Sequence, residues 1–298
     1  MSAHPTMPVS DALRHCGLVT RRCARNFYYG LKLTPEPQRS ALFTLYAWMR
    51  RADDLVDEAE PASTQCLARI EAFRAATERA LTGTGDDDDP LWIALADVAL
   101  RFELQRDALY LMLDGQIDDL AGRHYETFEQ VREYCYRVAS SVGLLCINVW
   151  GFHDPNAPAL AVDRGIAFQL TNMLRDYRED YDAGRIYLPA EDFAQHGLAP
   201  EELREWSDPP RCAHFVRAQA ARARSFYDRS APLDQMITPS CRPALWAMTT
   251  IYGSLLQKIE DEPSQIITRR RVRLGAWRKG LIAMRAKWFG HPTGNGSP

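Results

Sequence analysis

The stretch Gln169-Leu-Thr-Asn-Met-Leu-Arg-Asp-Tyr-Arg-Glu-Asp180 indicates how this chain folds. Its apolar residues return every three or four positions, which predicts an amphipathic helix. On a helical wheel, Gln169, Asn172, Asp176 and Asp180 fall within roughly 80° of one another and form a stripe about 16 Å long. All four side chains carry oxygen atoms, the donors that a hard cation such as Mg²⁺ prefers. The stripe therefore suits a bound divalent cation.

A second polar helix face lies about 120 residues earlier, in Tyr46-Ala-Trp-Met-Arg-Arg-Ala-Asp-Asp-Leu-Val-Asp-Glu58. Tyr46, Arg50 and Asp57 fall within roughly 60° of Asp53 on the wheel. Two carboxylates at i,i+4 weaken an isolated helix by a few tenths of a kcal/mol, so we expect a compensating group. A divalent cation and Arg50 are two such groups, and a solvated acidic face without function is the alternative. If both stripes hold ions around one diphosphate, they must face each other within one bundle.

The rest of the chain has the same helical period, and we find no convincing alternation of the kind that predicts strands. No repeat of 20–50 residues supports a solenoid, so we predict an all-α, single-domain helical bundle over residues 1–298, with flexible ends at about 1–10 and 291–298 and an acidic loop at 82–89. The predicted helices cover 39–58, 63–81, 91–120, 128–150, 160–182, 212–230, 242–260 and 274–289.

Composition excludes several functional classes. The 298 residues carry a formal net charge of −3, which gives no global basic field for nucleic acid. The histidines are isolated from one another, and no glycine-rich nucleotide motif occurs, so neither zinc nor a Rossmann cofactor is predicted. The longest nearly apolar run, Val142 to Phe152, is shorter than the roughly 20 residues of a spanning helix. Seven scattered cysteines and the lack of a signal peptide favour a cytoplasmic location.

Two further acidic groups carry less weight. Asp114 and Asp118 are spaced i,i+4 with Asp119 beside them, but no polar stripe extends that face, so we interpret it as an exposed or accessory patch. Asp86 to Asp89 are consecutive and cannot share one helix face, which favours a solvated loop.

Together the motifs resemble those of the squalene/phytoene synthase family, the head-to-head branch of class I isoprenoid synthases. Arg50 to Asp57 is similar to the family's first aspartate-rich motif, and Gln169 to Asp180, followed by Gly184-Arg-Ile-Tyr-Leu-Pro189, is similar to the second. Tyr134-Cys-Tyr-Arg-Val-Ala-Ser-Ser-Val-Gly143 resembles a third family segment. The resemblance runs from about Arg25 to Lys287. It departs from the family at Ala24 to Phe27, where relatives commonly have serines.

The resemblance implies a central active-site cavity and a role for each motif residue. It places Asp53, Asp57, Asn172, Asp176 and Asp180 around several Mg²⁺ ions, with Mn²⁺ as a substitute. Tyr134 would lie near the reacting carbons, and the dry wall would come from Val142 to Phe152 with Phe168, for which an ordinary core is equally consistent. The diphosphate oxygens would be held by Tyr46, Arg50, Gln169, Asn172, Tyr252 and Arg271.

The implied reaction is the head-to-head condensation of two isoprenyl diphosphates. We rank presqualene diphosphate from two farnesyl diphosphates first, phytoene from two geranylgeranyl diphosphates next, and squalene with NADPH as a further alternative. A non-catalytic assembly homologue and a terpene cyclase are disfavoured, because both aspartate motifs are intact and the Tyr134 segment is present.

The C-terminal stretch 274–289 combines apolar residues at helical spacing with basic ones. Such a helix can lie on an anionic membrane surface or pack on the bundle, and the sequence leaves both open. The first choice would make the protein peripheral to the inner face of the membrane.

Overall fold

The computed structural model describes residues 7–57, 64–84 and 88–289, and within these ranges it contains helices and no strand beyond one isolated bridge between Phe152 and Ile237. This confirms the prediction of an all-α fold. The helices are α1 (Val9–Cys23), α2 (Arg25–Leu31), α3 (Gln38–Asp57), α4 (Thr64–Thr82), α5 (Pro90–Phe102), α6 (Arg106–Leu120), α7 (Phe128–Cys135), α8 (Ser141–Trp150), α9 (Ala157–Asp182), α10 (Ala190–Gln195), α11 (Pro200–Glu205), α12 (Pro209–Ser230), α13 (Leu233–Met236), α14 (Arg242–Asp261) and α15 (Ala276–Phe289). Shorter turns are the π-helical η1 (Tyr136–Ser140) and the 3₁₀ turns η2 (Pro239–Cys241) and η3 (Pro263–Ile267).

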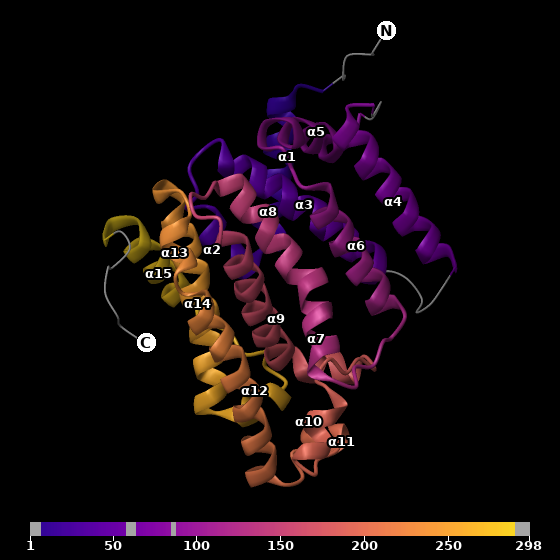
Figure 1. Ribbon diagram of the computed structural model, residues 1–298, viewed down its shortest axis with the longest axis vertical. Helices are drawn as coiled ribbons and strands as arrows, with labels where there is room; N and C mark the ends of the chain where they lie inside the picture. The colour runs from indigo at the N-terminus through magenta and orange to yellow at the C-terminus, as the bar shows by residue number, and fades with distance from the viewer. Residues whose placement is uncertain (1–6, 58–63, 85–87, 290–298) are drawn as a thin grey trace.

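Helix α9 is the centre of the bundle. It packs against α12, α8, α14 and η1, and Figure 1 shows it running through the middle of the molecule with α15 and α4 at opposite edges. One large apolar core draws side chains from α1 through α15, and its largest fully buried members include Trp48 and Phe215. Burying apolar surface in this way is the main force that holds the helices together.

A glycine allows α9 to approach η1 closely. A Cβ atom at Gly165 would lie 2.6 Å from the Cα of Ser140, inside the backbone of the facing turn. Ser140 also donates its hydroxyl to the carbonyl of Val162 at 2.8 Å, which fixes the same crossing. A larger residue at 165 would therefore push apart α9, which carries Asn172, and η1, which follows Tyr134.

Two predicted helices are interrupted. The stretch predicted as one helix over 91–120 is broken at Glu103, whose φ of 47° is left-handed and ends α5 before α6 begins. The stretch predicted over 128–150 is helical throughout, but the π-helical turn η1 separates α7 from α8. Turns of this kind are frequent near functional sites. Local apolar spacing does not mark either change, because both helices of each pair keep similar periods.

The predicted flexible and loop regions need partial correction. Helix α1 begins at Val9, so residues 9 and 10 are helical, whereas 1–6 and 290–298 lie outside the described residues. Asp89 is not a freely solvated loop residue, because it accepts a hydrogen bond from the Leu91 amide at 2.9 Å and forms an ion pair with Arg51 at 2.5 Å. It therefore caps α5, and residues 85–87 beside it are not described.

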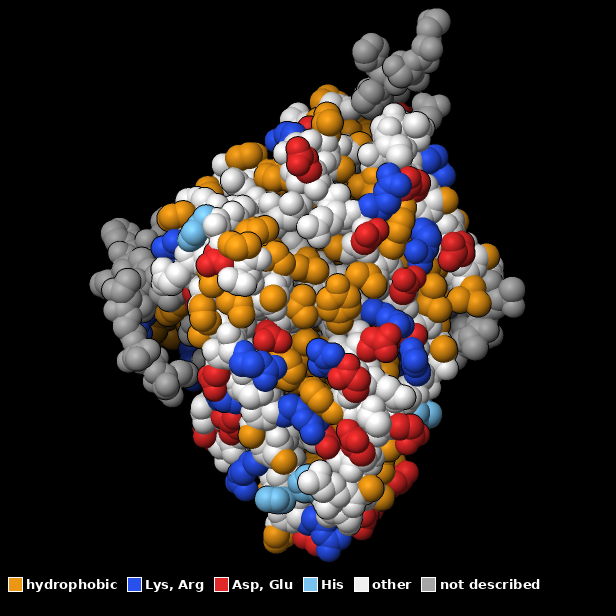
Figure 2. Space-filling view, in the orientation of Figure 1, with side chains coloured by type: hydrophobic (Ala, Val, Ile, Leu, Met, Phe, Trp, Pro, Cys, Tyr) orange, Lys and Arg blue, Asp and Glu red, His pale blue; other side chains and the backbone are white. Residues whose placement is uncertain are grey.

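The surface carries no large field of one sign on the face seen in Figure 2. Apolar side chains gather across its middle, while acidic and basic side chains are mixed below and to the right. This mixture agrees with the small net charge of −3. Among the described helices, none is long and apolar enough to span a bilayer.

Candidate active site

A cavity of about 330 Å³ lies between α2, α3, α6, α8, α9 and α14. Most of its wall is apolar, and the polar side chains of Asp53, Gln116, Asp119, Gln169 and Asn172 border it. Such a space can hold a hydrocarbon chain with a charged group at its polar end. Tyr46 and Asp53 of the first predicted stripe and Gln169 and Asn172 of the second thus line one cavity, whereas Asp176 and Asp180 lie further along α9, outside its wall.

The first stripe contributes Asp53 and Tyr46 to the wall. Gln116 on α6 donates its side-chain N–H to Asp53 Oδ1 at 2.9 Å, which holds the carboxylate in place. Tyr46 is half-buried. Its phenol pKa is raised above the ordinary value, mainly by burial and to a smaller extent by the nearby Cys23 and Asp53. Asp57 ends α3, but its side chain lies outside the part of the structure that is described, as do those of Arg25 and Asn26 at the departure noted above.

The second stripe follows one face of α9 as predicted. Asn172 donates its side-chain N–H to Gln169 Oε1 at 3.3 Å, and both residues line the cavity. The side-chain oxygen of Asn172, Oδ1, is buried without a hydrogen-bond partner. A buried acceptor of this kind costs free energy unless a ligand or cation meets it, so Asn172 is prepared for a bound group.

Asp176 and Asp180 sit one turn apart and differ in electrostatics. Burial would raise the pKa of Asp176, but hydrogen bonds from Arg175, at 2.6 and 2.7 Å, and from Arg271 outweigh it and lower the pKa. Burial and repulsion by Asp176 raise the pKa of Asp180 from its ordinary 3.8 to about 7, and Arg185, 3.9 Å away, offsets this only in part. The negative charge of Asp180 is therefore only partly compensated by the basic side chains around it.

Asp119 was misjudged from the sequence as part of an exposed or accessory patch. It lines the cavity, accepts hydrogen bonds from the Tyr134 hydroxyl at 2.8 Å and the Tyr187 hydroxyl at 3.0 Å, and its carboxylate is close enough to raise the pKa of Asp180. Burial raises the pKa of Asp119 itself to about 6. The available signal was the polar pair Gln116 and Asp119, three residues apart in an otherwise apolar helix face.

The other two acidic residues of that patch are each paired with an arginine, Asp114 at the surface and Asp118 partly buried. Asp114 forms an ion pair with Arg74 at 2.5 Å, and Asp118 with Arg137 at 2.6 Å. Carboxylates that already have arginine partners need no metal to compensate their charge.

Tyr134 is buried beside the polar end of the cavity. Burial, together with the adjacent Asp119, raises the pKa of the Tyr134 phenol well above its ordinary value, so the phenol stays protonated. Its O–H group donates a hydrogen bond to Asp119. Its ring stacks on Tyr187 with centroids 5.2 Å apart. The phenol is thus held in a fixed place at the border between polar and apolar walls.

Three of the predicted diphosphate-binding residues, Arg271, Arg50 and Tyr252, do not line the cavity itself. Arg271 reaches the site by pairing with Asp176 and, at 3.6 Å, with Glu179. Arg50, on α3, forms an ion pair with Asp54, the neighbour of Asp53. Tyr252 is buried behind the cavity, packed on Phe168 with ring centroids 4.6 Å apart, and burial raises its pKa while Arg175 opposes the shift.

The expected dry wall is formed by helix α8 and its neighbour. Val142, Leu145, Ile147 and Trp150 line the cavity together with Phe168 of α9. Phe152 does not belong to this wall, because it follows the end of α8 and is 39% exposed. The apolar wall excludes the ordered water that polar side chains would hold.

The chemistry of the donor set fits a divalent cation that arrives with its substrate. Within the described residues, no three acidic, histidine or cysteine side chains lie close enough to form a complete protein cage for one ion. Mg²⁺ does not need such a cage, since it takes one or two carboxylates, substrate phosphate oxygens and retained waters. Asp180, whose charge is only partly compensated, and the unpartnered Asn172 oxygen match this requirement.

Comparison with known proteins identifies relatives over nearly the full chain. The squalene/phytoene synthase family matches residues 20–278. The 15-cis-phytoene synthase of Synechococcus elongatus is 35% identical over 285 residues and covers 91% of each chain, and the phytoene synthase of Mycobacterium tuberculosis is 33% identical over 93% of this chain and 91% of that protein. A crystal structure of a dehydrosqualene synthase superposes with a TM-score of 0.85 at 28% identity and covers 96% of this chain and 99% of that one.

Proposed function

The chain belongs to the squalene/phytoene synthase family, and from this premise we propose that it condenses two isoprenyl diphosphates head to head in the cavity between α3 and α9. Members of this family are prenyltransferases. The observation that carries the proposal is the shared cavity, in which Asp53 from one aspartate motif and Asn172 from the other border the same apolar space.

We propose that Asp53, Asp57, Asn172, Asp176 and Asp180 hold divalent cations together with the substrate diphosphate. Bound Mg²⁺ supplies Lewis-acid neutralisation of the diphosphate and so makes it a leaving group. Arg271 adds charge-assisted hydrogen bonds to the departing oxygens once they compete with Asp176 for its guanidinium. Tyr46, Arg50, Gln169 and Tyr252 are proposed to support the same diphosphates.

The apolar wall and Tyr134 have separate proposed roles. Phe168 and the α8 side chains keep water from the allylic cation, which water would quench. The Tyr134 hydroxyl orients the reacting carbons, and its oxygen accepts the departing proton as its own proton passes to Asp119 across the 2.8 Å hydrogen bond. The pKa of about 6 for Asp119 favours this transfer more than an ordinary carboxylate would.

Two substrate lengths are carried forward, each by one observation. Relatives such as the Synechococcus elongatus 15-cis-phytoene synthase, 35% identical to this chain, support two geranylgeranyl diphosphates at least as well as the farnesyl reading placed first from the sequence. The dehydrosqualene synthase structure, with a TM-score of 0.85, supports keeping farnesyl diphosphate. The NADPH-dependent alternative gains no support from the comparisons.

The test is to incubate the purified protein and Mg²⁺ with each diphosphate, with and without NADPH, and to identify products by mass spectrometry. Phytoene from geranylgeranyl diphosphate would establish the C20 substrate, and a C30 product from farnesyl diphosphate would establish the C15 substrate. A reaction that gives a condensed product with neither substrate would refute the proposed function. Because any such product is lipophilic, we also propose a peripheral membrane location for this protein.

A further inference from the structure

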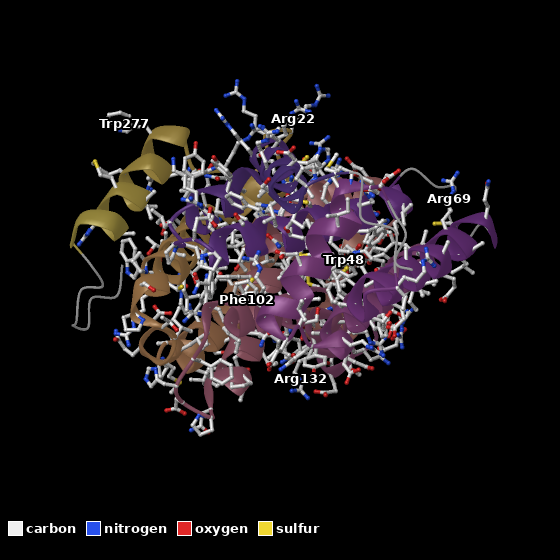
Figure 3. All side chains as sticks on the ribbon, turned by 90° about the horizontal axis from the view of Figure 1, so that it is seen from above. Arg22, Trp48, Arg69, Phe102, Arg132 and Trp277 are labelled. Carbon is white, nitrogen blue, oxygen red and sulfur yellow. The ribbon has the colours of Figure 1, made fainter. Side chains whose placement is uncertain are left out.

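Helix α15 presents large apolar side chains to solvent. Trp277 is 88% exposed, Leu281 51% and Met284 53%. These positions fall within roughly 60° of one another on the helical wheel, so they form one stripe. Figure 3 shows Trp277 on the outer side of α15, pointing away from the bundle, whereas Trp48 lies inside it.

The opposite face of the same helix is packed on the protein. Ile282, Ala283 and Ala286 are buried, and α15 rests against α14 and α2. Lys279 lies over the ring of Tyr29 on α2, 5.8 Å from its centroid. The inner face of α15 therefore packs on the bundle, which was one of the two alternatives left open by the sequence. On the outer face, no described side chain buries the apolar stripe.

The charge around this stripe is strongly asymmetric. Residues 276–289, which form α15, contain four arginine and lysine residues and no acidic one, although the whole chain carries a net charge of −3. Arg278 and Arg285 are exposed, and on the wheel both lie about 80–100° from Trp277, beside the stripe. An apolar stripe bordered by basic side chains is complementary to an anionic lipid surface.

We propose that the outer face of α15 docks this protein on anionic membrane lipid. Trp277, Leu281 and Met284 enter the boundary between headgroups and acyl chains, where tryptophan is especially favoured. Arg278 and Arg285 pair with headgroup phosphates. A protein partner would fit less well, because a helix with four basic residues and no acidic one matches a continuous anionic surface better than a mixed one.

The position of α15 also links the surface to the cavity, and this step rests on the proposed function. Helices α2 and α14, on which α15 packs, contribute Leu31 and Met248 to the cavity wall. Docking through α15 would place this wall next to the bilayer. A lipophilic product would then leave the cavity near the phase that dissolves it.

The experiment is co-sedimentation of the full chain with vesicles of phosphatidylcholine alone or mixed equally with phosphatidylglycerol, which needs no turnover. We expect binding to the mixed vesicles that weakens with added salt. The triple variant Trp277→Ser, Leu281→Ser, Met284→Ser should lower vesicle partitioning about tenfold or more, since binding scales with inserted apolar area. The matched control is Leu100→Ser on α5, which removes a side chain that is 84% exposed and should change nothing.

Several results would overturn the proposal. Equal vesicle binding by the wild type and the triple variant would exclude this stripe as the docking surface, and an absence of wild-type binding to either vesicle would exclude the lipid. If the wild type dimerises without lipid and the triple variant is monomeric by sedimentation velocity, the stripe binds a second copy instead. A loss with Arg278→Glu and Arg285→Glu on mixed vesicles only would support the proposed headgroup contacts.

Discussion

Replacing Asp180 by asparagine should make the metal-free protein more stable. In the folded chain, burial and the neighbouring Asp176 raise the pKa of Asp180 to about 7. The folded state therefore binds a proton more tightly at this residue than the unfolded state does. The sign follows directly, because an acid with a raised pKa destabilises the fold once pH exceeds its ordinary 3.8 and the cost reaches its full value above about 7.

The size of the effect follows from the two pKa values. The difference between 3.8 and about 7, at about 1.4 kcal/mol per pKa unit, sets an upper bound of about 4 kcal/mol above pH 7. Asparagine avoids the charge but also loses the attraction of Arg185, 3.9 Å from Asp180. We therefore expect a gain of about 2 kcal/mol, a few degrees in melting temperature for a chain of this size.

Thermal unfolding with a chelator at pH 8 and pH 5.5 measures this gain. The wild type should become more stable on acidification within this window, and Asp180→Asn should show a smaller pH slope and no turnover. Mg²⁺ with a diphosphate should stabilise the wild type more than the variant. Asp182→Asn is the matched control on the same helix, because Arg204 at 2.7 Å lowers the pKa of Asp182 and its loss should slightly destabilise. A variant no more stable than wild type at pH 8 would refute the reasoning.

Three further predictions concern other residues of the bundle. Tyr134→Phe removes the hydroxyl that contacts Asp119 at 2.8 Å, and we expect turnover to fall about 100-fold with an unchanged circular dichroism spectrum; near-normal turnover would exclude the proposed proton transfer. Asp176→Ala should abolish Mg²⁺-dependent product formation, and retained turnover would contradict the proposed metal site. Arg164→Leu removes a buried guanidinium that pairs with Asp234 at 3.1 Å, so urea denaturation should show a loss of about 3–5 kcal/mol; a loss below 1 kcal/mol would show that Asp234 is satisfied without it.

Some of the candidate site was predictable because it is local. The order Gln169, Asn172, Asp176 and Asp180 places four polar side chains on one helix face by geometry alone, and the structure keeps them there. The break at Glu103 was missed because its left-handed φ of 47° leaves no gap in the apolar period.

Partners on different helices could not be read from the sequence. Asp119 was predicted to belong to an exposed or accessory patch, because the sequence does not show that Tyr134 and Tyr187, from other segments, donate hydrogen bonds to it.

The sequence by itself determined the helical class, the two polar stripes and the family, because each depends on spacing within one segment. Only the tertiary structure decided which distant residues meet, since Arg271 reaches Asp176 across 95 positions of the chain. It also decided the two faces of α15, where burial of Ile282 leaves Trp277 outside. Helical periodicity fixes angles around one axis, whereas contacts between axes depend on how whole apolar faces pack together.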